Sequence, residues 1–260
     1  MDPTDSEILT RIRNHARFKQ RSRDTHHDIH LQELNARLNL GLSLPPSPDP
    51  PDDDPFYAPP NLANTSRIEV VLLGNSMLER FKSTGAAARL RNLESAWNAG
   101  CGGDKNENVL YRLEQGLYGM LKVAQQTADG KCNIKLWILA SGTNNLHPKR
   151  AFRASDVESW KLLVEACLRI APKSRVVACD VLYRQDIPDG TVDASNQSLK
   201  ECLDGINDER VTWVGARHII SKEMLVDKVH LNEEGYEVWD GVLWPHVARV
   251  LALENGGQDV

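Results

Sequence analysis

The chain has 260 residues, of which 41% are hydrophobic and 26% charged, and its formal net charge at pH 7 is −5. This composition is that of an ordinary globular protein with room for one sizeable domain and some extensions. An acidic chain lacks the clustered Lys and Arg side chains that bind phosphate backbones, which excludes nucleic acid as the main partner.

The sequence shows no sign of a membrane span or a secretory leader. No stretch approaches the roughly 20 apolar residues that cross a bilayer, and residues 1–7 lack a basic start followed by an apolar run. The five cysteines are scattered and contain no C-x-x-C pair, a pattern that favours reduced thiols over a disulfide framework. We therefore expect a cytoplasmic protein without a membrane-spanning segment.

The first 62 residues differ in character from the rest of the chain. They end in a tract rich in proline and aspartate over residues 45–55, and such a tract favours extended, solvated chain and is typical of a linker. Upstream, scattered Ile and Leu residues give patchy helical periodicity around a basic run between residues 11 and 23, which indicates a solvated helix face. We predict three segments: a partly disordered N-terminal arm and linker over 1–62, a folded domain over 63–254 and a tail over 255–260.

From residue 67 onward, short apolar runs alternate with helical stretches. Apolar runs that are continuous indicate strands buried on both faces, and they occupy 68–73, 134–140, 176–182 and 211–214, with one more strand expected before residue 98. Helical periodicity is found over 106–125, 156–170 and 233–253. Strands and helices that alternate at this spacing predict an α/β fold, a three-layer α/β/α sandwich of flavodoxin-like type with a mostly parallel sheet.

Polar groups follow the predicted strands, at the edge where parallel sheets gather functional residues. Ser76 directly follows the first strand, in a Gly-Asn-Ser turn at the start of a helix whose N-H groups face a developing negative charge. The glycine-rich loop 98–104 follows the second strand and brings backbone N-H groups close to a ligand. Asn144 and Asn145 follow the next strand, and their amides are N-H donors suited to an oxyanion.

A carboxylate and an imidazole precede the last predicted helix. His230 is the residue type that accepts a serine proton, and Asp227, three positions earlier, is placed to fix its tautomer and stabilise the imidazolium. Each of these pieces alone occurs often by chance. Their order and placement at the ends of successive strands together indicate nucleophilic chemistry at Ser76.

The segments resemble blocks I, II, III and V of the SGNH (GDSL) hydrolase family and occur in the same order. The matching motifs are Gly74-Asn75-Ser76, the run 98–104, Gly142-Thr143-Asn144-Asn145 and His230-Leu231, within a likeness that covers roughly residues 67 to 250. The resemblance implies that Ser76 is the nucleophile and one oxyanion donor, with the backbone N-H of Gly103 and the side chain of Asn144 as the others. It further implies that His230, oriented by Asp227, acts as base and then acid.

The resemblance also implies the reaction and its partners. It indicates a serine carboxylic-ester hydrolase that transfers an acyl group to water through an acyl-serine intermediate, with no metal and no cofactor. The expected partner is a small acyl ester, with Met77, Asn145 and Leu231 as substrate contacts, and a homodimer is a further expectation from the family. Within the enzyme class, the alternative is an acetylesterase acting on an acetylated sugar or a small metabolite.

One residue departs from the family pattern, because Asn75 stands where the family usually has Asp. Asparagine is nearly isosteric and keeps an acceptor oxygen, so a hydrogen bond that braces the loop can survive while the negative charge is lost. This departure leaves open a second class of function, an SGNH-fold binding protein with weakened catalysis.

Simpler interpretations exist for several of these residues. Ser76 alone reads as a helix N-cap, and Cys101 in the glycine-rich loop is an alternative nucleophile for His230. The loop does not match the spacing of a nucleotide-binding P-loop. The histidines at 26, 27 and 30 lack further spaced ligands, so a solvated segment is expected there rather than a metal site.

Overall fold

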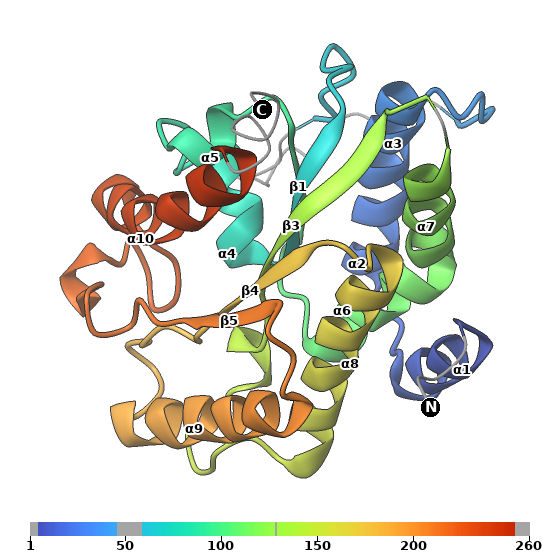
Figure 1. The fold of residues 1–260 in the computed structure, drawn as a ribbon. Coiled ribbons are helices and arrows are strands. Elements are labelled where there is room, and N and C mark those ends of the chain that lie inside the picture. The colour runs from blue at the N-terminus through green and yellow to red at the C-terminus, as the bar shows by residue number, and fades with distance from the viewer. Residues whose placement is uncertain (1–4, 46–58, 128, 253–260) are drawn as a thin grey trace, which may run out of the picture.

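The computed structural model describes residues 5–45, 59–127 and 129–252. Among these residues, five parallel strands form one sheet in the order β2-β1-β3-β4-β5 (Figure 1). Their bounds are β1 (Ile68–Asn75), β2 (Ala96–Cys101), β3 (Cys132–Ala140), β4 (Arg175–Cys179) and β5 (Val211–Val214). The predicted parallel sheet is confirmed.

Helices cover both faces of the sheet. Successive side chains of a strand point to opposite faces, so the apolar strands present an apolar surface on each side for helices to pack on. Val71 and Leu73 of β1 pack in one apolar cluster, and Leu72 packs in the other. The first cluster involves α1 (Asp5–His15), α3 (Leu31–Leu38), α6 (Asn106–Arg112), α7 (Tyr118–Gln126), α8 (Ala154–Ile170) and α9 (Asp189–Ile206). The second involves α4 (Ser76–Glu79), η2 (Arg80–Lys82), α5 (Arg89–Asn92) and α10 (Glu233–Ala252). The three-layer α/β/α architecture is therefore confirmed.

The long helix predicted over 106–125 is interrupted. It divides into α6, a π-helical turn η3 (Leu113–Leu117) and α7, because Gly116 adopts φ +113° within the turn. Helix α9 was not predicted, since its buried face combines Val192 and Leu199 with Ser195 and Asn196 and so shows little apolar periodicity. The helices at the other two predicted positions are present as α8 and α10.

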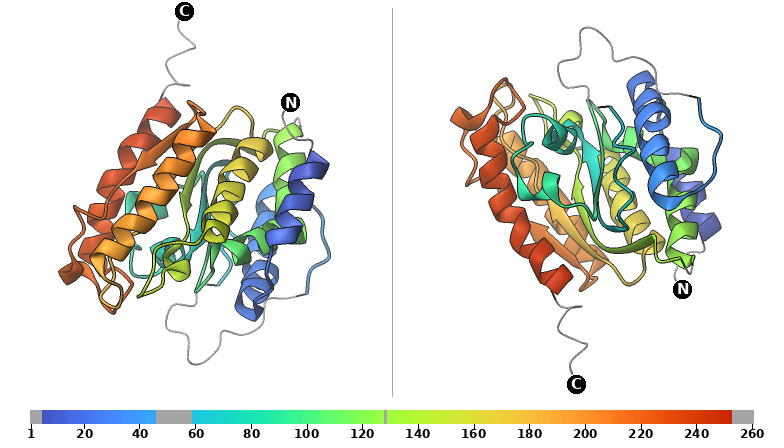
Figure 2. Two further views of the ribbon diagram at one scale, coloured as in Figure 1. Left: turned by 90° about the horizontal axis from the view of Figure 1, so that it is seen from below. Right: turned by 90° about the horizontal axis from the view of Figure 1, so that it is seen from above.

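The N-terminal residues pack on the domain instead of extending from it. Ile8 and Ile12 of α1 and Leu34 of α3 are each at most 1% exposed and belong to the same cluster as the β1 side chains. Figure 2 shows these helices, in blue, alongside α7. Side chains before and after the domain boundary predicted at residue 62 thus pack in one core. The linker beyond Pro45 up to residue 58 and the predicted tail 255–260 lie outside the described residues.

The same segment covers the outer edge of the sheet. β2 is an edge strand, and α2 (Gln20–Thr25), η1 (His26–His30) and α3 lie against its free side. Arg37 of α3 donates to the carbonyl of Ala96, and His30 contacts the carbonyl of Gly100. Two backbone carbonyls that would be unpaired on an uncovered edge strand therefore have partners. His26 and His30 are fully buried, which contradicts the solvated segment expected there.

Within the described residues, no helix combines the length and apolar character that a membrane crossing requires.

Candidate active site

Ser76 is the first residue of α4, directly after β1. The strand runs very close to its neighbour β3 here, because a Cβ atom on Gly74 would lie 1.9 Å from the carbonyl oxygen of Ala140. Asn75 caps the helix: its Oδ1 accepts a 3.0 Å hydrogen bond from the N-H of Met77. The cap is therefore Asn75 and not Ser76, and the bracing bond expected for an asparagine at this position is present.

Ser76, His230 and Asp227 form one hydrogen-bonded chain, although 154 residues separate the serine from the histidine. The Nε2 atom of His230 lies 2.9 Å from the Oγ of Ser76, and its Nδ1 atom lies 2.8 Å from the Oδ2 of Asp227. Both distances are those of good hydrogen bonds. With Nδ1 donating to the carboxylate, Nε2 is left to accept the serine proton.

Asp227 is held as a charged carboxylate. Its Oδ1 accepts hydrogen bonds from the backbone N-H groups of Val229 (2.7 Å) and His230 (2.8 Å), which form a tight turn around it. Partial burial would raise the pKa of Asp227, but these bonds and the bond from the His230 ring outweigh burial and lower the pKa to about 2. The carboxylate therefore remains an acceptor for the imidazole across the neutral pH range.

The imidazole of His230 is kept neutral. Burial lowers the pKa of His230 below its ordinary value, the Asp227 hydrogen bond raises it, and the positive charges of Arg80 and Arg184 lower it. Arg80 lies 3.6 Å from the Oδ2 of Asp227, the oxygen that also binds the ring, and its side chain is 7% exposed. A neutral imidazole with an unprotonated Nε2 is the form that a general base requires.

The sequence did not indicate Arg80. It lies on the turn after α4, and no spacing motif relates that turn to a residue almost 150 positions later. Its contact with Asp227 exists only through the folding of α4 against the 225–231 segment.

The predicted oxyanion donors leave neighbouring strands at the same end of the sheet. Asn75 pairs with Cys101 in the β1–β2 register, and Gly74 pairs with Ala140 in the β1–β3 register, so the segments that follow these strands are adjacent. Gly103 sits in the loop after β2 with φ +70°, a conformation that favours glycine. Within the described residues, its N-H donates no hydrogen bond to a backbone carbonyl.

Asn144 lies in the 3-10 turn η4 (Thr143–Asn145) and faces the same loop. Its Nδ2 donates a 2.8 Å hydrogen bond to the carbonyl of Asp104. This bond fixes which end of the amide carries the nitrogen, and it leaves the second N-H of the amide for another acceptor. The structure thus brings together the segments that carry Ser76, Gly103, Asn144, Asp227 and His230.

Two of the three predicted substrate contacts are placed elsewhere. Leu231 is 0% exposed and packs in the second core cluster. Asn145 is buried, and its amide is used by the N-H of Asn106 and by the carboxylates of Glu107 and Asp156. Because both side chains are enclosed by protein, these two predictions are not supported. Met77, by contrast, lines a small hollow together with Val181, Leu182 and Trp239.

Cys101 is unsuited to act as the alternative nucleophile. It is fully buried at the end of β2, and burial raises the pKa of its thiol far above the ordinary value. A protonated thiol without access to solvent is a poor nucleophile.

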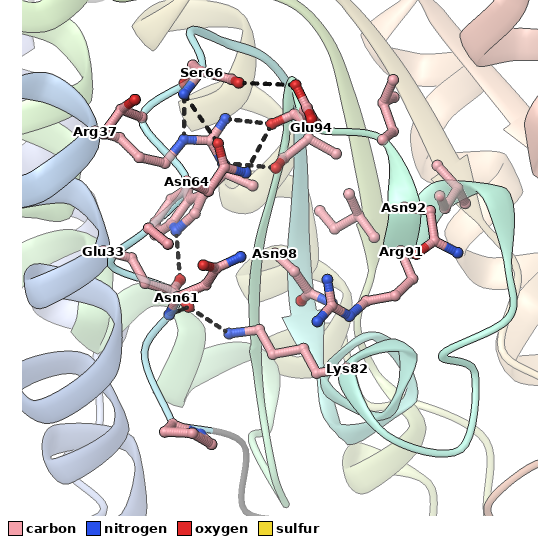
Figure 3. A pocket seen from close by; sticks show the side chains of 18 residues that line it. Glu33, Arg37, Asn61, Asn64, Ser66, Lys82, Arg91, Asn92, Glu94 and Asn98 are labelled. Carbon is pink, nitrogen blue, oxygen red and sulfur yellow. Dashed lines mark hydrogen bonds and ion pairs between the residues drawn. The ribbon is translucent and has the colours of Figure 1, made fainter.

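A wide polar cavity of about 430 Å³ lies away from this site, between α3, residues 59–66 and the start of β2 (Figure 3). It contains none of the residues of the Ser76 chain. Most of its charge is already satisfied, since Glu33 pairs with Lys82 at 3.3 Å and accepts the indole N-H of Trp97. Arg37 donates to four backbone carbonyls.

Comparison with known proteins gives relatives in sequence and in structure. The chain is 26% identical over 196 residues to platelet-activating factor acetylhydrolase IB subunit alpha1 from Rattus norvegicus, covering 72% of this chain and 78% of that protein. A protein from Streptococcus pneumonia described as a platelet activating factor superposes with a TM-score of 0.59 at 13% identity. The superposition covers 94% of this chain and 100% of that protein. A GDSL-like lipase from Bacteroides thetaiotaomicron superposes with a TM-score of 0.52 at 17% identity, covering 70% of this chain and 88% of that protein.

No protein-family model matches the chain. The resemblance to SGNH (GDSL) hydrolases that the four motifs predicted is nevertheless confirmed. The relatives in sequence are platelet-activating factor acetylhydrolase subunits, and the structural neighbours include GDSL-like lipases. The chain has the α/β fold of the SGNH hydrolases.

Proposed function

We propose that this protein is a serine ester hydrolase that cleaves short-chain acyl esters through an acyl-serine intermediate. The observation that carries the proposal is the continuous hydrogen-bonded chain from Ser76 Oγ through His230 to the Asp227 carboxylate, with both links below 3.0 Å. Nucleophile, base and orienting acid stand in the relative geometry that acyl transfer uses on several unrelated folds.

In the proposed reaction, Ser76 Oγ attacks the carbonyl carbon of the ester while His230 Nε2 takes the hydroxyl proton. The carbonyl electron pair moves onto oxygen and gives a tetrahedral oxyanion. Collapse of this intermediate expels the alcohol, which takes the proton from His230 and leaves the acyl group on Ser76. A water molecule, deprotonated by His230, then attacks the acyl-serine, and His230 returns this proton to Ser76 Oγ as the carboxylic acid departs.

The developing oxyanion is proposed to bind the backbone N-H groups of Ser76 and Gly103 and the free N-H of Asn144. The first-turn N-H groups of α4 have no partner within the helix, and Gly103, with φ +70°, lies in the loop after β2, the neighbour of β1 in the sheet. Each such donor typically contributes a factor of about 10² to 10³ in turnover. Asp104, through its carbonyl, would set the orientation of the Asn144 amide.

A small acyl group is the substrate portion that we propose for this site. The nearby hollow is small and is lined by Asn75 and Met77, the two chain neighbours of Ser76, together with apolar side chains such as Trp239 and polar ones such as Asp180. The name of the sequence relative, an acetylhydrolase subunit, agrees with this size. Acetyl esters are therefore the first substrates to test.

The test compares p-nitrophenyl acetate hydrolysis by the wild type with that by Ser76→Ala and His230→Asn. Both variants are expected to lose at least about a thousandfold in kcat/KM, as removals of such residues do elsewhere. Ser159→Ala serves as the matched control, because Ser159 is a buried serine whose hydroxyl donates to the carbonyl of Ser155 in its own helix. Equal rates in the wild type and Ser76→Ala would instead favour a binding protein that has lost turnover.

Two proposals concern the setting of the enzyme. We propose a cytoplasmic location, supported by five cysteines that are all unpaired in the structure. The homodimer implied by the family resemblance also stays a proposal, which light scattering on the purified protein would test directly.

A further inference from the structure

We propose that the N-terminal segment 17–30 is a positioning element of the active site: Ser22 and Lys19 hold the loop 100–104 in the shape that presents the Gly103 N-H to the substrate oxygen. The inference rests on the proposed ester hydrolysis, because it assigns a task to residues that do not touch the reacting atoms.

The loop needs an outside support because of its place in the sheet. It follows β2, which is the edge strand, so the sheet gives it a neighbour only on the β1 side. The N-terminal segment occupies the other side. His30 contacts the carbonyl of Gly100 at 3.2 Å, and the Nδ2 of Asn108 donates to the carbonyl of Arg17 at 2.9 Å, so contacts bracket the loop at both ends.

Asp104 is the anchor of the loop and is fully buried. Its Oδ2 accepts a 2.9 Å bond from Arg112, and its Oδ1 accepts a 2.5 Å bond from the hydroxyl of Ser22. The same guanidinium of Arg112 donates to the carbonyl of Gly74, two residues before Ser76. One buried ion pair therefore ties the loop to the nucleophile turn, and Ser22 satisfies the carboxylate oxygen that this pair leaves open.

Lys19 acts on the peptide group next to the anchor. Its ammonium lies 2.5 Å from the carbonyl oxygen of Gly103 and 3.4 Å from that of Gly102. The closer contact is to the carbonyl of Gly103, so Lys19 fixes the orientation of the peptide group that joins Gly103 to the anchor Asp104. The longer contact reaches the carbonyl of Gly102, which shares a peptide group with the N-H of Gly103 and adds a weaker polarisation of that donor. A Cβ atom on residue 103 would lie 2.4 Å from the ammonium, so glycine leaves room for this contact.

The first experiment measures ester hydrolysis by Ser22→Ala and Lys19→Met, with Ser22→Thr, which keeps the hydroxyl, as the rescue variant and Ser159→Ala as the control. We expect kcat to fall by about tenfold or more in Ser22→Ala and severalfold in Lys19→Met, with KM changed less than twofold, since an oxyanion donor acts mainly in the transition state. Inhibition by a trifluoromethyl ketone, which forms an oxyanion on the serine, should weaken in parallel, while Ser22→Thr should recover most of the activity.

The second measurement is amide hydrogen exchange over residues 100–108, which does not depend on turnover. Exchange should accelerate there in Ser22→Ala and remain unchanged in Ser159→Ala. Lys19 is partly exposed, so Lys19→Met is expected to fold even if Ser22→Ala does not.

The outcomes separate the two proposals. If Ser76→Ala abolishes hydrolysis but Ser22→Ala and Lys19→Met keep wild-type kcat and inhibitor affinity, the positioning role is overturned and the ester hydrolase stands. If the wild type hydrolyses no ester, the proposed function fails, and unchanged exchange over 100–108 in the variants would then overturn the bracing role as well.

Discussion

Asn75 shows how a residue can depart from a family pattern and still keep its structural task. Its Oδ1 caps α4 through the N-H of Met77, and the side chain is 1% exposed. The hydrogen bond requires an acceptor oxygen and not a charge, which explains why the turn that presents Ser76 keeps its geometry.

We expect Asn75→Ala to lower the free energy of unfolding by about 1 kcal/mol, because the cap is lost. Asn75→Asp keeps the acceptor oxygen, so its free energy of unfolding should fall clearly less than that of Asn75→Ala. Urea denaturation followed by circular dichroism measures both. An equal loss in the two variants would show that the cap contributes nothing to stability.

Arg80 should tune the base. Its charge lowers the pKa of His230, and therefore its removal should raise that pKa. In Arg80→Gln, the acidic limb of the kcat/KM profile, which reports protonation of His230 in the free enzyme, should move to higher pH. Arg184→Gln, at a residue that pairs with Asp186, offers a comparison with the other cation. A limb that stays in place or moves to lower pH in Arg80→Gln would remove Arg80 from this role.

At the level of elements, the hydrophobic pattern predicted the sheet well because β1, β3 and β4 are mainly apolar runs buried on both faces, whereas the edge strand β5 is only partly buried. β4 ends at Cys179, earlier than predicted, and the carboxylate of the next residue, Asp180, accepts the N-H groups of Ala216 and Arg217. Helix α9 was missed because polar Ser195 and Asn196 take core positions, and no periodicity reveals that.

The candidate site was predictable to the extent that it follows strand ends. Ser76, Gly103, Asn144 and the Asp227/His230 pair all lie where a parallel sheet gathers polar groups. Arg80, Ser22 and Lys19 were not indicated, because their roles arise from contacts between segments that no sequence spacing connects. For the same reason the burial of Leu231 and the internal hydrogen bonds of Asn145 became visible only in the fold.

Two glycines near the interrupted helix should respond in opposite ways to alanine. Gly116 has φ +113° with nothing closer than 3.7 Å to an added Cβ, so Gly116→Ala should destabilise the fold by about 1 kcal/mol through backbone strain alone. Gly119 is helical and an added Cβ would meet nothing within 4 Å, so Gly119→Ala should stabilise by about 0.5–1 kcal/mol.

The measurement is urea denaturation of the two variants beside the wild type. Destabilisation by both substitutions would mean that Gly119 does not lie in a regular helix, and stabilisation by both would contradict the positive φ at Gly116.

For the whole molecule, the main difference from the sequence-based expectation is that the N-terminal residues belong to the core. The tract of proline and aspartate suggested a separate arm, but Ile8, Ile12 and Leu34 complete the apolar layer on α7 and α8. The four buried side chains that carry this packing, those three and Leu38, are divided between two helices, so the periodicity of either helix alone was too weak to indicate it.

This packing buries two histidines, and it predicts a dependence of stability on pH. Burial, together with the charge of Arg112, lowers the pKa of His26 to about 4 and that of His30 well below its ordinary value. The unfolded chain therefore binds more protons below about pH 6.5, and the free energy of unfolding should fall as the pH drops toward 4, by up to about 1.4 kcal/mol per pH unit for each histidine.

In His26→Gln, this loss between pH 6.5 and pH 4 should be smaller, while the exposed His218→Gln serves as the control. Urea denaturation at a series of pH values tests the prediction. A slope in His26→Gln equal to that of the wild type would show that His26 can be protonated without cost in the folded state.

The most direct measurement of the central claim is labelling with a fluorophosphonate, which reacts with activated serines, followed by peptide mass spectrometry. We expect one phosphonyl group on the peptide that contains Ser76, and we expect His230→Asn to slow labelling by at least about a hundredfold because the base is removed. A wild-type protein that stays unlabelled, or that carries the label on another serine, would contradict the assignment of Ser76 as the activated nucleophile.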